Sequence, residues 1–113
     1  MDMDVTEIDG PLTHIRLTGR LDSPGVDRIE IKFTAAVVSR GRSVVVDLSG
    51  VDFLASMGIR MFIATARALH LKGSKMVLFG ATDAVFSVLE HVALDQIIPI
   101  AATEAEAIER LRG

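Results

Sequence analysis

The chain has no cysteine, asparagine, tryptophan or tyrosine, and each absence excludes a kind of site. Without cysteine it forms neither a disulfide nor a thiolate metal site, and without asparagine it has no N-glycosylation sequon. Without tryptophan and tyrosine it lacks the usual side chains that stack on bases. It has no dominant basic run either, and its formal net charge is −3. Nucleic-acid binding is therefore not expected.

The sequence also lacks a long apolar run. No segment approaches the roughly 18 uninterrupted apolar residues of a membrane-spanning helix. The acidic start, MDMDVTEIDG, has no apolar region typical of a signal peptide. We therefore expect a soluble, cytoplasmic protein without direct membrane insertion. Its 113 residues suffice for a single domain, residues 1–113, whose core needs no disulfide or metal.

Apolar periodicity along the chain predicts an α/β fold. Extended runs at 3–8 and 12–18 flank Asp9-Gly10-Pro11 and predict a β-hairpin. Helices and strands then alternate, which predicts a mixed sheet of about five strands, with about four helices and right-handed crossovers. The expected helices are 24–39, 56–71, 81–92 and a terminal one opened by Thr103, and the expected later strands are 44–48, 75–79 and 97–100.

Several residues mark where these helices begin and end. Ser23 is expected to cap the helix at 24–39, with Pro24 in its first position. Gly41 and Gly73 follow helical segments as stop signals. Thr103 and Glu106 form a capping box, in which Thr103 accepts from an amide and Glu106 reaches back.

The stretch 43–58, SVVVDLSGVDFLASMG, is the centre of the pattern. Its apolar, β-branched start predicts a strand buried on both faces, followed by a short loop and a helix that begins near Ser56. Amides at a helix start favour negative charge, so a hydroxyl there is a candidate for regulation. Serine is also a preferred N-cap, and the residues alone leave both roles open.

The helix at 56–71 is apolar on two sides. On a helical wheel, the side expected to face the sheet holds Ile59, Phe62, Ile63, Ala66 and Leu69. The opposite side holds Met57, Met61, Ala64 and Ala68, flanked by Arg60 and Arg67. Such a face indicates contact with a partner, the alternative being packing under the terminal helix or a loop. Gly58 is expected to allow close approach of a partner backbone.

These residues, in this order, resemble the STAS domain, the fold of bacterial anti-sigma factor antagonists and of the cytoplasmic tails of sulfate transporters. The resemblance covers nearly the whole chain. It is strongest in four segments: LTGRLD (17–22), VVVDLSGVDFLASMGIR (44–60), LKGSKMVL (71–78) and VLEHVALDQII (88–98).

The resemblance implies a regulatory role for Ser56. In the family the loop after the central strand usually has the sequence Asp-Ser-Ser/Thr-Gly, and its first serine is phosphorylated by a cognate anti-sigma factor kinase. Ser56 falls on that serine, Gly58 on the glycine, and Asp22 on an acidic residue that contacts the partner. Ala55 and Met57 depart from the pattern, because they replace the polar neighbours of the hydroxyl by apolar groups. The expected contact residues are Asp22, Ser23, Ala55, Met57, Gly58, Arg60 and Met61.

Three functions stay open. The first is an anti-sigma factor antagonist whose partners are a serine kinase of the GHKL type and a PP2C-type phosphatase. The second is a non-phosphorylated STAS subunit of a stress-signalling scaffold or membrane-transport complex, suggested by Ala55 and Met57. The third is a small-ligand or enzymatic α/β domain using the same cleft.

Other chemistry has little support in the sequence. His14, His70 and His91 stand singly, without the spacing of metal ligands, and are expected to be structural or on the surface. Asp47 and Asp52 flank the central loop, where ordering the backbone is a better interpretation than acid–base work. No phosphate-binding glycine motif or nucleophile elbow is present. We expect no catalysis, cofactor or metal.

Overall fold

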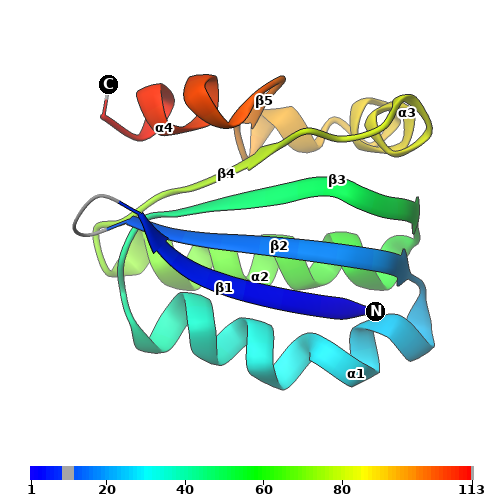
Figure 1. Cartoon of the computed structure of the whole chain (residues 1–113), viewed down its shortest axis with the longest axis horizontal. Coiled ribbons are helices and arrows are strands. Elements are labelled where there is room, and N and C mark those ends of the chain that lie inside the picture. Colours follow the sequence, from blue (N-terminus) through cyan, green and yellow to red (C-terminus); the bar gives the residue numbers. More distant parts are fainter. Residues whose placement is uncertain (9–11, 113) are drawn as a thin grey trace.

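Five strands form one sheet in which spatial order follows sequence order. The computed structural model describes residues 1–8 and 12–112, apart from the side chains of residues 7 and 8. Strand β1 pairs antiparallel with β2, and β3, β4 and β5 continue the sheet in parallel (Figure 1). The strands are β1 (Asp2–Ile8), β2 (Leu12–Leu21), β3 (Val44–Leu54), β4 (Met76–Phe79) and β5 (Ile100–Ala101). The predicted hairpin and mixed sheet are confirmed, and the predicted turn at residues 9–11 lies outside the described residues.

Four α-helices connect and flank the strands. They are α1 (Ser23–Thr34), α2 (Ser56–Leu71), α3 (Asp83–His91) and α4 (Glu104–Arg112). A π-helical turn, η1 (Ala35–Ser39), extends α1, and a 3-10 turn, η2 (Leu94–Gln96), follows α3. Within the part of the chain that the structure describes, no helix has the length and apolar character needed to cross a bilayer.

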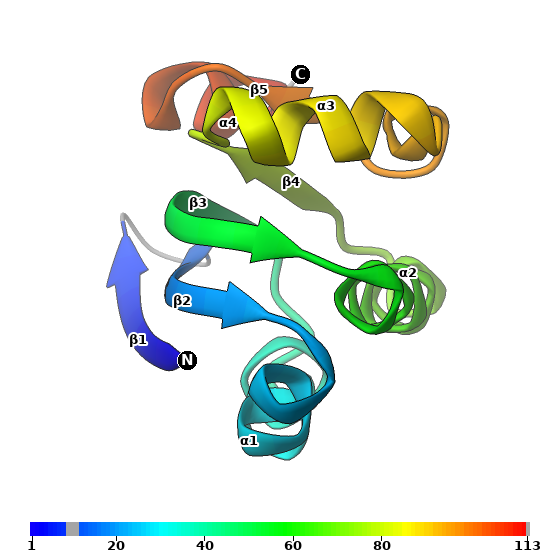
Figure 2. The ribbon, with the colours of Figure 1, turned by 90° about the vertical axis from the view of Figure 1, so that its right-hand side faces the viewer.

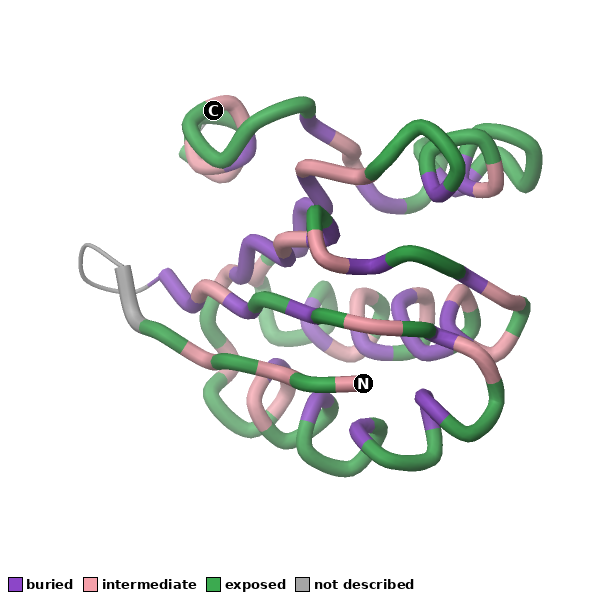
Figure 3. The backbone as a smooth tube through the Cα atoms, turned by 45° about the vertical axis from the view of Figure 1, so that its right-hand side comes forward, coloured by how far each residue is buried: buried purple, intermediate pink, exposed green. Residues whose placement is uncertain are grey.

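The sheet has an apolar core on each face, because alternate residues of a strand point to opposite sides. On one face, Val44 and Val46 belong to the same buried cluster as Phe33 of α1 and Phe62 of α2. The two phenylalanine rings pack edge to face, with 5.8 Å between their centroids. On the other face, the side chain of Val45 packs with that of Ala107 of α4. Figure 2 shows α1 and α2 on one side of the sheet and α4 on the other, and Figure 3 marks which positions along the strands and helices are buried.

The predicted boundaries hold at some ends of elements and fail at others. Gly41 and Gly73 adopt positive φ, as expected for residues that follow a helix. The Thr103 hydroxyl accepts from the Glu106 amide at 3.2 Å, but the Glu106 carboxylate accepts from Arg110. The cap of α1 is Asp22, so the prediction of Ser23 as the cap is wrong by one residue.

The central strand is longer than predicted. We expected a strand at 44–48 and then a loop, but β3 continues to Leu54 because its second half pairs with β2. The pairing of β2 with β3 has two register shifts, and at each of them β3 has one extra residue, so that Leu21 comes to lie opposite Leu54. The last strand is displaced: the predicted 97–100 starts too early, and β5 is Ile100–Ala101.

The orientation of α2 corrects the helical wheel. Its buried residues are Gly58, Met61, Phe62, Thr65 and Leu69. Met61 is 2% exposed, whereas Ile59, Ile63 and Ala66 are only partly buried. Because α2 packs against α1 as well as the sheet, its buried side is turned toward Met61 relative to the predicted one. The prediction that Met61 faces a partner is therefore wrong.

Candidate functional site

The carboxyl ends of β2 and β3 lie side by side and bring two predicted regions together. Leu21 is paired with Leu54 in the sheet, and the Ala55 amide donates to the Leu21 carbonyl at 3.0 Å. Asp22 and Ser56 follow these residues directly, so the starts of α1 and α2 are neighbours. In parallel sheets this edge is where ligands and partners commonly bind.

Asp22 organises the β2 side of this edge. Its Oδ1 accepts from the Gly25 amide at 2.9 Å, which caps α1, and its Oδ2 accepts from Arg20 Nε at 3.2 Å. The Arg20 guanidinium also lies 4.3 Å from the ring centroid of Phe53, which is 41% exposed. Gly25 permits the arrangement, because a Cβ there would overlap the Arg20 carbonyl oxygen. This edge therefore presents an exposed, paired array of acidic, basic and aromatic groups.

The charge of Asp22 is linked to folding. The Gly25 amide, together with Arg20, holds the pKa of the Asp22 carboxyl below its ordinary value of 3.8, against the desolvation that raises it. Because folding lowers this pKa, the ionised form stabilises the native state. The contribution is present above the unfolded pKa of about 3.9 and is lost as pH falls through the lower folded value.

Asp22→Asn should lower the melting temperature at neutral pH, because it removes the negative charge that Arg20 and the start of α1 favour. The asparagine side chain still offers an oxygen that can cap the helix, so the effect is that of the charge. The difference in melting temperature between the variant and the wild type should shrink as pH falls below 3.8. Thermal unfolding followed by circular dichroism at several pH values measures both effects. A difference that grows in acid would contradict the assigned role of the charge.

The start of α2 has an unusual cap. Ala55 occupies the N-cap with φ −109° and ψ 174°, and it offers no side-chain hydrogen bond. Its carbonyl accepts from the Gly58 amide at 3.0 Å and the Ile59 amide at 3.3 Å. The Ser56 and Met57 amides, at the first two helical positions, precede the first intrahelical bond. Ser56 is exposed there, so a negative group on its hydroxyl would lie next to these amides.

Ala55→Asp should stabilise the protein by about 1 kcal/mol, because the extended backbone at Ala55 already suits a capping carboxylate. Urea unfolding would measure the gain, with Ala64→Asp, at an exposed position in the middle of the same helix, as the control that should destabilise slightly. An equal effect of both changes would contradict the N-cap assignment.

The structure separates the predicted contact residues into two groups. Asp22, Ser23, Ala55 and Ser56 meet at the edge described above, and Arg60 is exposed one turn along α2. Met57 is half-buried against the core. Gly58 and Met61 are buried, so the expectation that they meet a partner is wrong. Arg20, Gly25 and Phe53 were not predicted, although the sequence LTGRLD includes Arg20 and the exposed end of β3 includes Phe53.

Two of the remaining polar candidates, His14 and Asp47, make contacts within the fold. His14 Nε2 lies 3.1 Å from Glu104 Oε1, and its ring packs beside Phe79. Asp47 Oδ1 accepts from the Ser49 amide at 2.8 Å, which fits the expected ordering of the backbone. Among residues 1–8 and 12–112, no cluster of three or more histidine and acidic side chains could hold a metal ion.

Comparisons with known proteins agree with this geometry. The model of the STAS domain matches residues 2–107. The anti-sigma-B factor antagonist of Listeria monocytogenes is 26% identical over 106 residues, which cover 94% of this chain and 93% of the relative. An anti-sigma factor antagonist from Mycobacterium paratuberculosis superposes with a TM-score of 0.87 at 24% identity, over 99% of this chain and 94% of that one.

A further solved structure is the Bacillus cell fate determinant SpoIIAA in its phosphorylated form. It superposes with a TM-score of 0.70 at 23% identity, and the superposition covers 98% of this chain and 100% of that one. At these identities the superpositions show the fold. The family-model match spans nearly the whole length, and the chain belongs to the STAS domain family.

Proposed function

We propose that this protein is an anti-sigma factor antagonist, which binds an anti-sigma factor and thereby regulates transcription that depends on a sigma factor. The end-to-end similarity to the Listeria antagonist supports this role. The function is protein binding, and the contact surface is the edge formed by Asp22, Ser23, Phe53, Ser56 and Arg60.

Phosphorylation of Ser56 is the switch in this proposal. The observation that supports it best is the exposed Ser56 hydroxyl at the uncapped start of α2. A phosphate there would add a charge of about −1.5 to −2. Helix amides typically favour such a charge by about 0.3–1 kcal/mol, so the fold should tolerate it. The solved structure of SpoIIAA is of a phosphorylated form, which supports a fold compatible with phosphate.

The phosphate would act on the partner instead of on the fold. It would lie beside half-buried Met57 and near ionised Asp22, so a docked protein would have to desolvate two negative groups. Arg20 is already engaged with Asp22 and Phe53. The unphosphorylated protein would therefore bind the anti-sigma factor, a serine kinase of the GHKL type, and the phosphorylated protein would release it. A PP2C-type phosphatase would restore binding.

Ser56→Asp should weaken binding to the anti-sigma factor by at least about tenfold, whereas Ser56→Ala should keep the wild-type affinity. The measurement is the dissociation constant for the kinase by calorimetry. Ser39→Asp is the matched control, because Ser39 is exposed and precedes the amino end of β3, whereas Ser56 follows its carboxyl end. The proposal fails if Ser56→Asp and Ser39→Asp bind equally well.

A second candidate is favoured by the apolar neighbours of Ser56. Ala55 cannot cap and Met57 is half-buried, so the loop lacks the polar side chains that a kinase would meet. In this alternative the protein is a non-phosphorylated STAS subunit of a stress-signalling scaffold or membrane-transport complex. Normal binding by Ser56→Asp, with no labelling by a cognate kinase, would favour it.

A further inference from the structure

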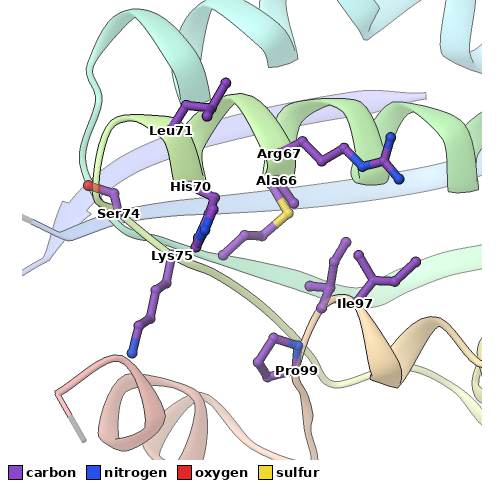
Figure 4. Close-up of a pocket in the computed structure, with 10 residues that line it drawn as sticks. Ala66, Arg67, His70, Leu71, Ser74, Lys75, Ile97 and Pro99 are labelled. Atoms are coloured by element: carbon purple, nitrogen blue, oxygen red, sulfur yellow. The ribbon is translucent and has the colours of Figure 1, made fainter.

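A pocket lies at the far end of α2 from Ser56. It is bounded by the second half of α2, by the turn that enters β4 and by the segment 97–99 before β5, and its volume is ≈ 500 Å³. His70 is 14 residues beyond Ser56, which places it about 20 Å along the helix. In Figure 4, His70 points from α2 toward the wall that includes Pro99. The pocket is therefore separate from the proposed partner surface.

The interior of this pocket is apolar. Six of the ten lining residues are apolar. Met76 and Ile98 are 3% and 1% exposed and form its base, whereas Ile97 is 51% exposed on its wall. A concave apolar site with a few polar groups and a volume of about 300–1,000 Å³ is typical of small-molecule sites. The geometry thus favours a ligand with a compact apolar body.

The rim of the pocket is basic. Arg67, His70 and Lys75 line it, and none of its lining residues is acidic. Arg67 and Lys75 are exposed, and within the described ranges neither side chain forms an ion pair. The surrounding segment, 53–82, has four lysine and arginine residues and no aspartate or glutamate, in a chain whose net charge is −3. The local charge therefore favours an anionic head group.

We propose that this pocket binds a small amphipathic anion, a carboxylate with a medium-length hydrocarbon tail. The tail would lie over Met76 and Ile98, and the carboxylate would meet one cation of the rim, Arg67 at one end of the pocket or Lys75 at the other, because the two side chains extend in different directions (Figure 4). Arginine suits this contact because its guanidinium can bind a carboxylate with two hydrogen bonds. Each methylene that enters the pocket should tighten binding about three- to fourfold.

The test is calorimetric titration of the full chain with octanoate, decanoate and decanol. Decanoate should bind saturably, about tenfold more tightly than octanoate, and more tightly than decanol of the same length. Arg67→Gln with Lys75→Gln should weaken decanoate binding at least about tenfold. Arg28→Gln with Lys32→Gln is the matched control, because it removes the same two charges at exposed positions outside the pocket.

A second variant tests the site without changing its cations. Ile97→Asp places a negative charge on the exposed wall and should abolish decanoate binding while the melting temperature stays near that of the wild type. The proposal is overturned if decanoate does not bind, if the Arg28 and Lys32 control weakens binding as much as the Arg67 and Lys75 change, or if decanol binds as well as decanoate. Sedimentation that shows a dimer disrupted by Ile97→Asp would assign the pocket to a second copy of the chain and would also overturn it.

Discussion

Met61→Glu is expected to unfold the protein or to lower its free energy of unfolding by about 3–5 kcal/mol. The Met61 side chain is 2% exposed and packs in the core between the sheet, α1 and α2. A carboxylate at this position would be buried without a partner, and the apolar contacts of the methionine would be lost. Because small domains have a total stability of about 5–15 kcal/mol, the loss would be a large fraction of it.

The control for Met61→Glu is Ala64→Glu, which introduces the same side chain three residues further along α2 at an exposed position. Its free energy of unfolding should stay within about 0.5 kcal/mol of the wild type. Urea denaturation of both variants measures the contrast. If Met61→Glu were as stable as Ala64→Glu, the orientation of α2 would be wrong and Met61 would return to the partner surface.

Gly58→Val should reduce stability by about 1–3 kcal/mol through overpacking. A Cβ at Gly58 would lie 2.7 Å from Leu54 Cδ1 and 3.2 Å from Leu21 Cβ. Gly58 lies where the start of α2 passes close to the ends of β2 and β3, so the substitution would also disturb the edge around Asp22 and Ser56. The glycine is needed for packing within the protein and not for the approach of a partner.

A graded series tests this explanation of Gly58. Gly58→Ala should cost less than Gly58→Val, because Leu54 Cδ1 is the end of a flexible side chain and alanine favours the helix. In a Leu54→Ala background, the added cost of Gly58→Val should fall, as expected for residues in contact. The free energy of unfolding, measured by urea denaturation, distinguishes overpacking inside the protein from obstruction of a partner, because only overpacking lowers it. A fully stable Gly58→Val protein that fails to bind would contradict the packing role.

Features set by local backbone chemistry were predictable from the sequence. Gly41 and Gly73 stop helical segments because positive φ favours glycine. Thr82 accepts from the Val85 amide, as a helix cap does. Val26, Ile29, Phe33 and Val37 recur at helical spacing and are all buried, although the last of them lies in a π-helical turn. The exposed position of Ser56 also follows from the predicted start of α2.

Features set by tertiary packing were not predictable in this way. Thr65 is polar, yet it is buried in α2 because its hydroxyl donates to the Met61 and Phe62 carbonyls. The wheel assigned α2 a single inner face, whereas packing against α1 turned Met61 inward. The pairing of the second half of β3 with β2 includes two register shifts, each with an extra residue in β3, so the stacking of Arg20 on Phe53 could not be predicted from spacing alone.

In the proposed function, phosphate on Ser56 controls binding at the edge formed by Asp22, Phe53 and Arg60. The most direct measurement compares the affinity of the cognate anti-sigma factor kinase for unphosphorylated protein and for protein with one phosphoserine at position 56, verified by intact mass. Phosphorylation should weaken binding by at least about tenfold, while the far-ultraviolet circular dichroism spectrum and the melting temperature change little. Equal affinity of the two forms, both folded, would contradict it.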